Sequence, residues 1–252
     1  MKKFIIKSVT WTAAVIASAQ AVEHNALIMP NFTVEWHEIT QETYSTMLPL
    51  FNAIKPVYVD AFLNLVHTIT PGLAHEPGER TVPTVTTITA SLQADWTNRI
   101  TKLYTELHDG HIAIAYLAIA RDNEQAPIGF VLFKQRDIKK VLANDVINII
   151  EGSLDRIDSN PDAQDQIYVS PLAVKPGTQK KGVGKALVLV IFDHCPQIKK
   201  IYLRTYAHKA NKNAQNFYEH VGFRRTITGS FTSDKDDFGL GNAQIVYEYR
   251  KT

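Results

Sequence analysis

Glycines and lysines gather in one short stretch, "KPGTQKKGVGKA", where a strand-like apolar run gives way to a helix-like one. A helix start presents backbone N–H groups without partners and a partial positive charge. Gly182 and Gly184 carry no Cβ, so a ligand could approach that backbone closely. Lys180, Lys181 and Lys185 add full positive charges. This combination predicts a site for a phosphate-bearing ligand, and the alternative is a basic, solvated helix start without a ligand.

Two common phosphate-binding motifs do not match this spacing. A P-loop that starts at Gly177 would need lysine after Gly182, where Val183 stands. If the loop instead ended at the next Gly-Lys pair, Gln179 would occupy the position of its first glycine. A dinucleotide fingerprint would need its third glycine at Leu187. Neither an ordinary nucleotide loop nor a dinucleotide-binding domain is therefore expected.

The pattern that does match is Gln/Arg-x-x-Gly-x-Gly/Ala at residues 179–184, directly after the strand "LAVKP". It resembles the acetyl-CoA-binding motif of the GNAT family of N-acetyltransferases. The stretch from 203 to 226 is similar to the second half of that family's core. The residues that match there are Asn211, Ala214, Phe217, Tyr218, Gly222 and Phe223. The resemblance covers residues 110–250 well and 30–110 only in outline.

The resemblance implies a single-domain α/β fold with a mixed, mostly antiparallel central sheet flanked by helices. A V-shaped gap between the two central strands would hold acetyl-CoA as co-substrate, and no metal is implied. Strand backbone would bind the pantetheine arm, which Asn211 would also touch, and the amides of residues 179–184 would bind the pyrophosphate. The implied cofactor-binding residues are Leu172, Ala173, Val174, Gln179, Lys180, Lys181, Gly182, Val183, Gly184, Lys185, Asn211 and Phe217.

The implied activity is transfer of an acetyl group to a primary amine, which attacks the thioester directly. A backbone N–H of the motif strand would polarise the developing oxyanion. Tyr218 matches the family's usual general acid, because a phenol stays protonated at neutral pH and can donate to a departing thiolate. The competing interpretation makes Tyr218 an aromatic of a buried helix face, as we expect for Phe217 beside it.

The general base is left open, because the motif strand "QIYVSPLAV" has no acid where many relatives carry glutamate, near Ser170. Tyr168 or Ser170 could relay a proton through water. Glu35 or Glu38 of the first strand could instead serve. An acceptor amine that is already neutral would need no base.

Hydrophobic periodicity and breaker residues predict one mixed α/β domain. We expect Pro49 and Pro56 to limit two helices, an irregular connection over 69–90, and Ser91 to cap the following helix. The expected helices span 42–51, 57–68, 91–108, part of 137–163 ending near Gly152, 183–194 and 211–220. The expected strands span 33–39, 111–120, 128–134, 166–174, 199–206, 222–226 and 243–249.

The first 21 residues have the basic, apolar and small-residue regions of a secretory signal peptide, so cleavage is expected after Ala21. The domain would then be residues 22–252, exported to a periplasm or medium; an uncleaved chain would be cytoplasmic. Loss of Lys2, Lys3 and Lys7 changes the formal net charge from +2 to −1. A near-neutral chain has no overall attraction for nucleic acid, and no later segment has transmembrane length.

Three further groups of residues admit two interpretations each. His108 and His111 could bind a metal, but two histidines exposed in a turn are the favoured interpretation. Cys195, the only cysteine, excludes an intrachain disulfide and is expected to be a small buried residue rather than a nucleophile. Four aromatic residues either line an acceptor pocket or belong to the core, which is favoured: Tyr58, Phe62, Trp96 and Tyr104.

The acceptor is expected to be a small-molecule or protein amine, recognised by a helical region at about 40–110 and an insertion at about 137–165. The chain could be a monomer or a homodimer. Two other functions remain open: a non-catalytic acyl-CoA-binding or sensory module, and a secreted interaction protein that keeps only the fold.

Overall fold

The computed structural model describes residues 31–73, 84–135, 146–152, 165–208, 211–231 and 243–251. The expected signal peptide and most of the 137–165 insertion lie outside these residues. The strands are β1 (Thr33–Ile39), β2 (Ala115–Arg121), β3 (Pro127–Lys134), β4 (Val146–Gly152), β5 (Gln166–Val174), β6 (Lys200–Tyr206), β7 (Arg224–Phe231) and β8 (Ala243–Arg250). The helices are α2 (Tyr44–Leu73), α3 (Val85–His108), α5 (Val183–Leu189), α6 (Ile191–His194) and α7 (Lys212–Val221).

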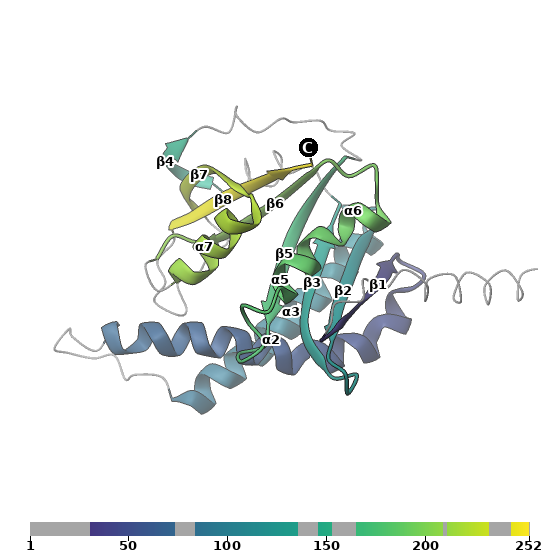
Figure 1. Ribbon diagram of the computed structural model, residues 1–252, viewed down its shortest axis with the longest axis horizontal. Helices are drawn as coiled ribbons and strands as arrows, with labels where there is room; N and C mark the ends of the chain where they lie inside the picture. Colours follow the sequence, from purple (N-terminus) through teal and green to yellow (C-terminus); the bar gives the residue numbers. More distant parts are fainter. Residues whose placement is uncertain are drawn as a thin grey trace, which may run out of the picture.

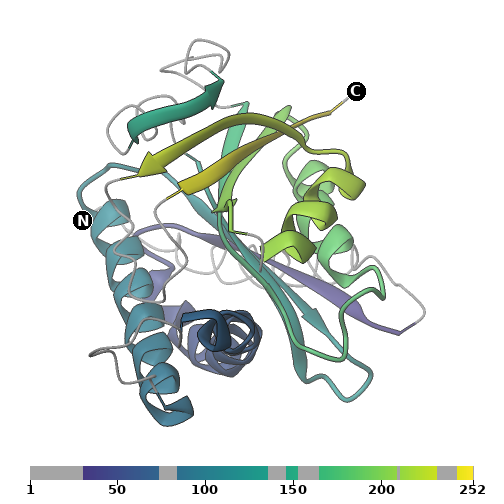
Figure 2. The ribbon, with the colours of Figure 1, turned by 90° about the vertical axis from the view of Figure 1, so that its left-hand side faces the viewer.

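The strands form one mixed sheet in the order β1-β2-β3-β5-β6-β8-β7-β4 (Figure 1). Every neighbouring pair is antiparallel except β5 and β6, which run parallel. Helices cover both faces of this sheet (Figure 2). The predicted fold class is therefore confirmed. Within the described residues, no helix combines the length and the apolar character needed to cross a membrane.

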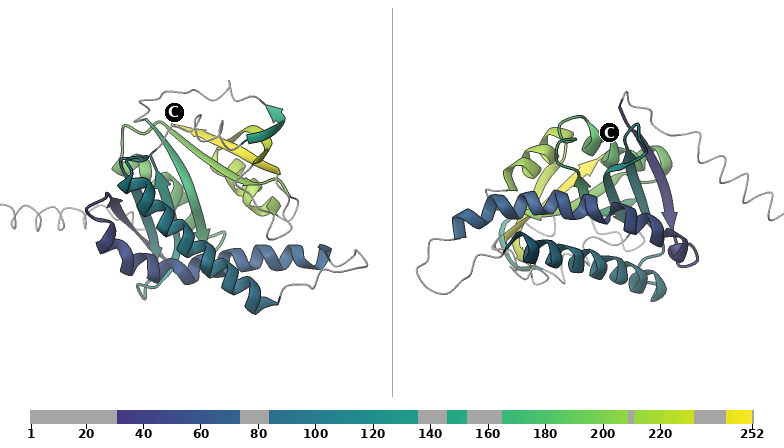
Figure 3. Two further views of the ribbon diagram at one scale, coloured as in Figure 1. Left: turned by 180° about the vertical axis from the view of Figure 1, so that it is seen from behind. Right: turned by 90° about the horizontal axis from the view of Figure 1, so that it is seen from below.

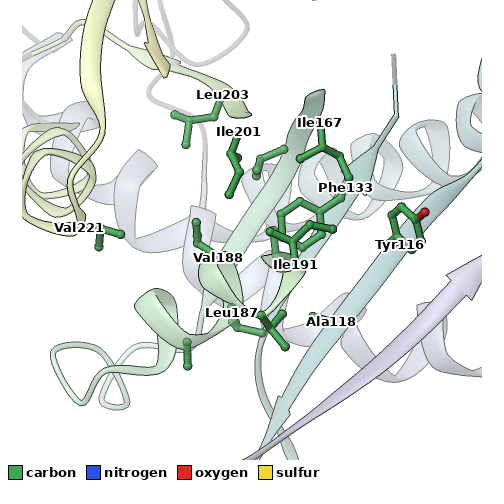
Figure 4. Packing of buried hydrophobic residues seen from close by; sticks show 14 of the residues in the cluster. Tyr116, Ala118, Phe133, Ile167, Leu187, Val188, Ile191, Ile201, Leu203 and Val221 are labelled. Carbon is green, nitrogen blue, oxygen red and sulfur yellow. The ribbon is translucent and has the colours of Figure 1, made fainter. Parts of the chain in front are cut away.

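One face of the sheet is covered by α5, α6 and α7, whose apolar side chains build a continuous core. Leu187 of α5 and Ile191 of α6 meet Phe133 of β3 and Ile201 of β6 in this core (Figure 4). The apolar residues Val183, Ala186, Leu187, Val190 and Ile191 recur at helical spacing, which accounts for this buried stripe. The helix is interrupted at Val190, which ends α5 and precedes α6, so two short helices replace the single one that was expected.

The opposite face is covered by α2 and α3, which lie side by side beneath the sheet (Figure 3). Phe51 and Tyr58 of α2 pack with Trp96 of α3, and the Trp96 ring meets Phe130 of β3 edge-on at a centroid distance of 5.3 Å. Tyr58 and Trp96 thus belong to the core, as favoured from the sequence, whereas Tyr104 is exposed and stacks on His108.

Helix α2 runs unbroken from Tyr44 to Leu73, so the prediction that prolines divide this region into two helices is wrong. Pro49 and Pro56 are both exposed, and their rings face away from the core. Each removes one helical hydrogen bond, at a cost of about 3 kcal/mol in a free helix. Burial of one continuous apolar face on the sheet offsets this cost, since tertiary packing overrides local propensity.

Helix α3 begins at Val85, six residues before the predicted start. The Thr84 side chain accepts a hydrogen bond from the Thr87 backbone N–H at 3.2 Å, so Thr84 rather than Ser91 is the N-cap. Ile88 in the extra turns is buried in the core with Leu92. Threonines disfavour helix locally, but a threonine cap and a buried isoleucine extend it here.

The segment 146–152, where a helix was predicted, is the edge strand β4. It pairs antiparallel with β7 from Val146↔Phe231 to Gly152↔Ile227. The short run "VINII" has β-branched residues that favour a strand, and periodicity alone cannot separate strand from helix over so few residues. The other residues of the predicted 137–163 helix lie outside the described ranges.

Candidate active site

The two parallel strands at the centre of the sheet separate after a short stretch of pairing. β5 and β6 pair at Gln166↔Lys200, Ile167↔Ile201 and Tyr168↔Tyr202, and at no later described residue. Beyond Tyr168, β5 continues to pair with β3, and β6 pairs with β8 along its whole length. Figure 1 shows the two strands diverging. The predicted V-shaped gap is present, and we call the point after Tyr168 and Tyr202 the fork.

Beyond the fork, one edge of β5 faces the gap. The Lys175 N–H donates to the Ile128 carbonyl of β3 at 2.8 Å. Because backbone groups alternate along a strand, the peptide groups of Ala173 also face β3, and those of Leu172 and Val174 face the gap. The Gln179 side chain donates to the Val174 carbonyl at 3.3 Å. Leu172 and Val174 thus fit the predicted pantetheine contact by backbone direction, and Ala173 does not.

The glycine-rich turn places the exposed start of α5 beside this edge. Gly182 is the N-cap of α5 with φ 85°, and Lys180 has φ 63°. A Cβ at Gly182 would meet no atom within 4 Å, so its backbone is open to approach. Lys181 and Lys185 are exposed next to it. The amides of the first turn have no helical partner and are available to an anion.

Gly184 has a different role from the one expected. A Cβ there would lie 3.0 Å from Cζ and 3.1 Å from Cε2 of Phe217. The space beside Gly184 is therefore filled by the ring of Phe217 from α7, not left open for a ligand. The second glycine of the motif lets α7 pack closely against α5, and this contact sets the position of the helix that carries Tyr218.

Two amide side chains tie the start of α7 to the end of β6. Asn211 donates to Thr205 Oγ1 at 2.6 Å and to the Tyr206 carbonyl at 3.1 Å. Gln215 donates to the same carbonyl at 3.0 Å. Asn211 thus lies at the end of β6, beyond the fork, and its NH₂ group holds the β6–α7 turn. Its contact with pantetheine stays a prediction.

Tyr218 extends from α7 into the core on the α5 side of the sheet and is 8% exposed. Its ring packs against Phe217, Phe223 and Tyr247 at centroid distances of 5.2, 5.7 and 5.6 Å. Burial raises the pKa of Tyr218 well above its usual value, and negative charge on Tyr168 or Tyr247 would raise it further. A phenol in this setting stays protonated, as a general acid requires.

A row of polar side chains that the sequence did not reveal crosses the opposite face of the sheet at the fork. Lys134 of β3 lies opposite Tyr168, Tyr168 opposite Tyr202, and Tyr202 opposite Glu248 of β8. All four residues are buried. The row exists only because four strands, distant in sequence, pair in this register. Strand alternation alone would place each residue on a face but not bring them together.

Each member of this row has a charged or phenolic partner. Lys134 Nζ donates to Glu106 of α3 at 2.7 Å, and the Tyr202 hydroxyl donates to Glu248 at 2.5 Å. Tyr168 accepts a hydrogen bond from Arg204 Nε at 3.2 Å. Buried charges are stable only when paired, and such clusters often mark functional sites.

The two carboxylates proposed as bases lie far from the fork. β1 is the edge strand, separated from β5 by β2 and β3. With strands about 4.8 Å apart, this is about 14 Å. Glu35 is also paired with Arg121 Nε at 2.6 Å. Ser170 stands in a bulge of β5, because Val169 and Leu172 pair with Phe133 and Val131 of β3. Tyr168 and Ser170 are thus the predicted base candidates near the gap.

The remaining candidates lie away from the gap. His108 ends α3 and hydrogen-bonds through Nδ1 to Gln41 at 3.0 Å. Cys195 is buried at the end of α6, and burial raises the pKa of its thiol, which disfavours a nucleophilic thiolate. Within the described residues no three His, Cys, Asp or Glu side chains are grouped to hold a metal.

Comparison with known proteins gives one family match and several distant structural likenesses. Among solved structures, the chain is similar to the PaiA N-acetyltransferase of Thermoplasma acidophilum in complex with coenzyme A, with 16% identity, TM-score 0.46, and coverage of 86% of this chain and 99% of that one. It is also similar to the ribosomal-protein-S5-alanine acetyltransferase of Vibrio fischeri, with 15% identity, TM-score 0.45, and coverage of 89% and 96%. No curated protein sequence matches the chain.

The family model described as "Acetyltransferase (GNAT) family" matches residues 85–223. Since this match spans more than half of the chain and includes both strands of the fork, the chain belongs to the GNAT acetyltransferase family.

Proposed function

We propose that the protein is an acetyl-CoA-dependent N-acetyltransferase that acts on a primary amine by direct attack on the thioester. The observation that carries this proposal is the fork: an interior strand edge left open beside an exposed helix start. Interior strand edges are normally paired, so an open one inside a sheet is suited to a ligand that takes the place of a strand. Family membership supports the same assignment.

The residues present fit acetyl-CoA. Peptide groups of Leu172 and Val174 face the gap and can pair with the amides of the pantetheine arm. The open backbone at Gly182 and the amides that follow suit the pyrophosphate, with Lys181 and Lys185 supplying charge. Acetyl-CoA would supply a thioester carbonyl at the fork. A backbone N–H on the open edge of β5 is suited to stabilise the oxyanion.

Tyr218 is the general acid in this proposal. Its ring packs on Tyr247, which pairs with Leu203 just beyond the fork, and burial keeps its hydroxyl protonated. Its role is to give a proton to the departing sulfur, so that the thiol rather than the thiolate leaves. The packing of Phe217 on Gly184 supports this role, because it fixes α7 relative to the helix that binds the pyrophosphate.

A non-catalytic acyl-CoA-binding module remains the second candidate, favoured by the lack of an acid on the motif strand. An experiment with two readouts separates the possibilities. Calorimetry measures coenzyme A binding, and thiol release from acetyl-CoA is followed with spermidine, an aminoglycoside and a peptide with a free N-terminus. Binding with thiol release supports the enzyme. Binding without release supports the module, and the absence of binding contradicts both and favours an interaction protein.

A further inference from the structure

Two tyrosines approach the fork from opposite faces of the sheet. Ile167 and Val169 point into the core beneath α5, so Tyr168 between them points to the face covered by α2 and α3. Tyr218 belongs to the core on the α5 side. The Tyr218 ring packs on Tyr247 at a centroid distance of 5.6 Å, and Tyr247 pairs with Leu203, the residue of β6 directly after the fork. Negative charge on Tyr168 would raise the pKa of Tyr218, in keeping with this arrangement. The reacting thioester would lie at this junction.

The hydrogen-bonding capacity of these hydroxyls is only partly used. A phenol has one hydrogen to donate and can also accept. Tyr168 accepts from Arg204 Nε at 3.2 Å, so its own hydrogen must point elsewhere and one acceptor position remains. The Tyr218 hydroxyl has no hydrogen-bond partner within the described part of the chain. Both groups can therefore give a proton to one neighbour and take one from another.

Two basic side chains lie beside Tyr168. Arg204 donates to it directly, and Lys134 lies opposite it on β3. The two nearby carboxylates have partners of their own: Glu106 pairs with Lys134, and Glu248 accepts from Tyr202 and pairs with Arg250. A hydrogen bond from a guanidinium stabilises a phenolate more than a phenol, so a proton can pass through Tyr168.

We propose that Tyr168 and Tyr218 form a proton relay across the fork, which carries the proton lost by the acceptor nitrogen to the sulfur of coenzyme A. This inference rests on the proposed acetyltransferase function. Tyr168 is then a second catalytic residue, in contact with the acceptor amine. Arg204 is a positioning residue, because it acts through the Tyr168 oxygen.

The step balances without an external base. The lone pair of the amine forms the C–N bond, the C–S bond breaks, and the sulfur leaves with that electron pair. Tyr218 gives its proton to the sulfur. Tyr168 gives its proton to Tyr218, directly or across one water, and takes the proton that the nitrogen loses. Both tyrosines end neutral, which accounts for a motif strand without an acid.

The test uses the full chain with Tyr168→Phe, Tyr218→Phe and the double variant. Thiol release is measured with whichever of the three amines the wild type acetylates, or with water as acceptor if none reacts. Each single variant should lower kcat about 100-fold, the usual contribution of a positioned proton-transfer group. Because both residues serve one proton path, the double variant should be no slower than the slower single variant. The KM for acetyl-CoA should be unchanged.

Three further measurements separate the relay from a structural role. Tyr44→Phe is the matched control, because it removes a buried hydroxyl that bonds to the Ile100 carbonyl at 3.0 Å, away from the fork. It should leave kcat unchanged. Arg204→Gln should lower kcat about tenfold, and Arg204→Lys should restore part of the loss. In mixtures of H₂O and D₂O, a plot of wild-type kcat against the fraction of deuterium should be curved, which indicates that several protons move together. The same plot for each tyrosine variant should be a straight line.

The outcomes distinguish this inference from the function on which it rests. A wild-type chain that binds no coenzyme A and releases no thiol contradicts both. A wild type that turns over, with Tyr168→Phe equally fast, contradicts the relay alone. A double variant slowed by the product of the two single effects shows two independent roles and also overturns the relay.

Discussion

The two edges of strand β6 differ in a way that defines the site. One edge pairs with β8 from Lys200↔Arg250 to Tyr206↔Gln244, along the full length of the strand. The other pairs with β5 only as far as Tyr202. The same strand is thus closed on one side and open on the other within one sheet. A closed edge stabilises the fold through its own hydrogen bonds, whereas the open edge leaves peptide groups for a ligand.

The largest effect is expected when the proposed general acid Tyr218, which lies beside the open edge, loses its hydroxyl. Tyr218→Phe should lower kcat about 100-fold, the usual contribution of a positioned proton-transfer group, because the sulfur would leave as thiolate. Affinity for acetyl-CoA should change less than about twofold, since the ring and its packing remain. Steady-state kinetics with calorimetry check both values. Unchanged turnover would remove Tyr218 from the mechanism.

The helix start beside the open edge offers a matched pair of substitutions. Gly182 and Gly177 have φ 85° and 84°, and a Cβ at either would meet nothing within 4 Å. Asp tolerates this conformation in both places. Gly182→Asp puts a carboxylate where the pyrophosphate is expected and should weaken coenzyme A binding about 100-fold by repulsion and obstruction. Gly177→Asp, with the same charge and strain, should weaken it only a few-fold. Equal losses measured by calorimetry would move the anion site elsewhere.

Substitutions at the Gly184–Phe217 contact, which holds α7 against α5 beside the open edge, should change the free energy of unfolding and not ligand binding alone. Gly184→Leu must displace the Phe217 ring, which lies 3.0 Å from the missing Cβ, and should destabilise the fold by about 1–3 kcal/mol. Combining it with Phe217→Ala should recover part of this loss, since the two residues compete for one space. Urea unfolding measures the free energies. Strictly additive losses would show that the contact does not limit the approach of α7.

The smallest effect is expected at Glu35 on the edge strand β1, far from the fork. His37, whose Nε2 lies 3.6 Å from the Glu35 carboxylate, lowers the pKa of Glu35, burial opposes this, and Arg121 lowers it further. The lowered pKa means that Glu35 stabilises the fold above its unfolded-state pKa of about 4.3, and the gain is lost as pH falls through the folded-state pKa. Glu35→Gln should cost less than about 1 kcal/mol at pH 7 for a partly exposed pair.

The same variant tests the assignment of the base. The difference in unfolding free energy between Glu35→Gln and wild type should shrink in acid, where wild-type Glu35 is also neutral. Turnover should stay at the wild-type level at every pH at which both chains are folded. A large loss of turnover at neutral pH would identify Glu35 as the base and contradict the relay through Tyr168.

The sequence predicted the regions in which neighbours along the chain decide the structure. The hairpin of β2 and β3, the strand–turn–helix of β5 and α5, and the helix α7 that begins after Asn211 and carries Tyr218 follow from local apolar periodicity and from a short motif. The prediction failed where distant packing overrode a local signal. Pro49 and Pro56 do not end α2, and Val146–Gly152 is a strand because β7 provides an edge for it.

By itself, the sequence determined the glycine-rich helix start, the fold class and the family, because backbone freedom at glycine and the spacing of apolar residues are properties of the local chain. The tertiary structure alone decided that Gly184 makes room for Phe217 and that Lys134, Tyr168, Tyr202 and Glu248 stand in one row. These contacts join residues far apart in the chain. Their existence depends on strand register and helix packing, which are set by burial of the whole core and not by any single segment.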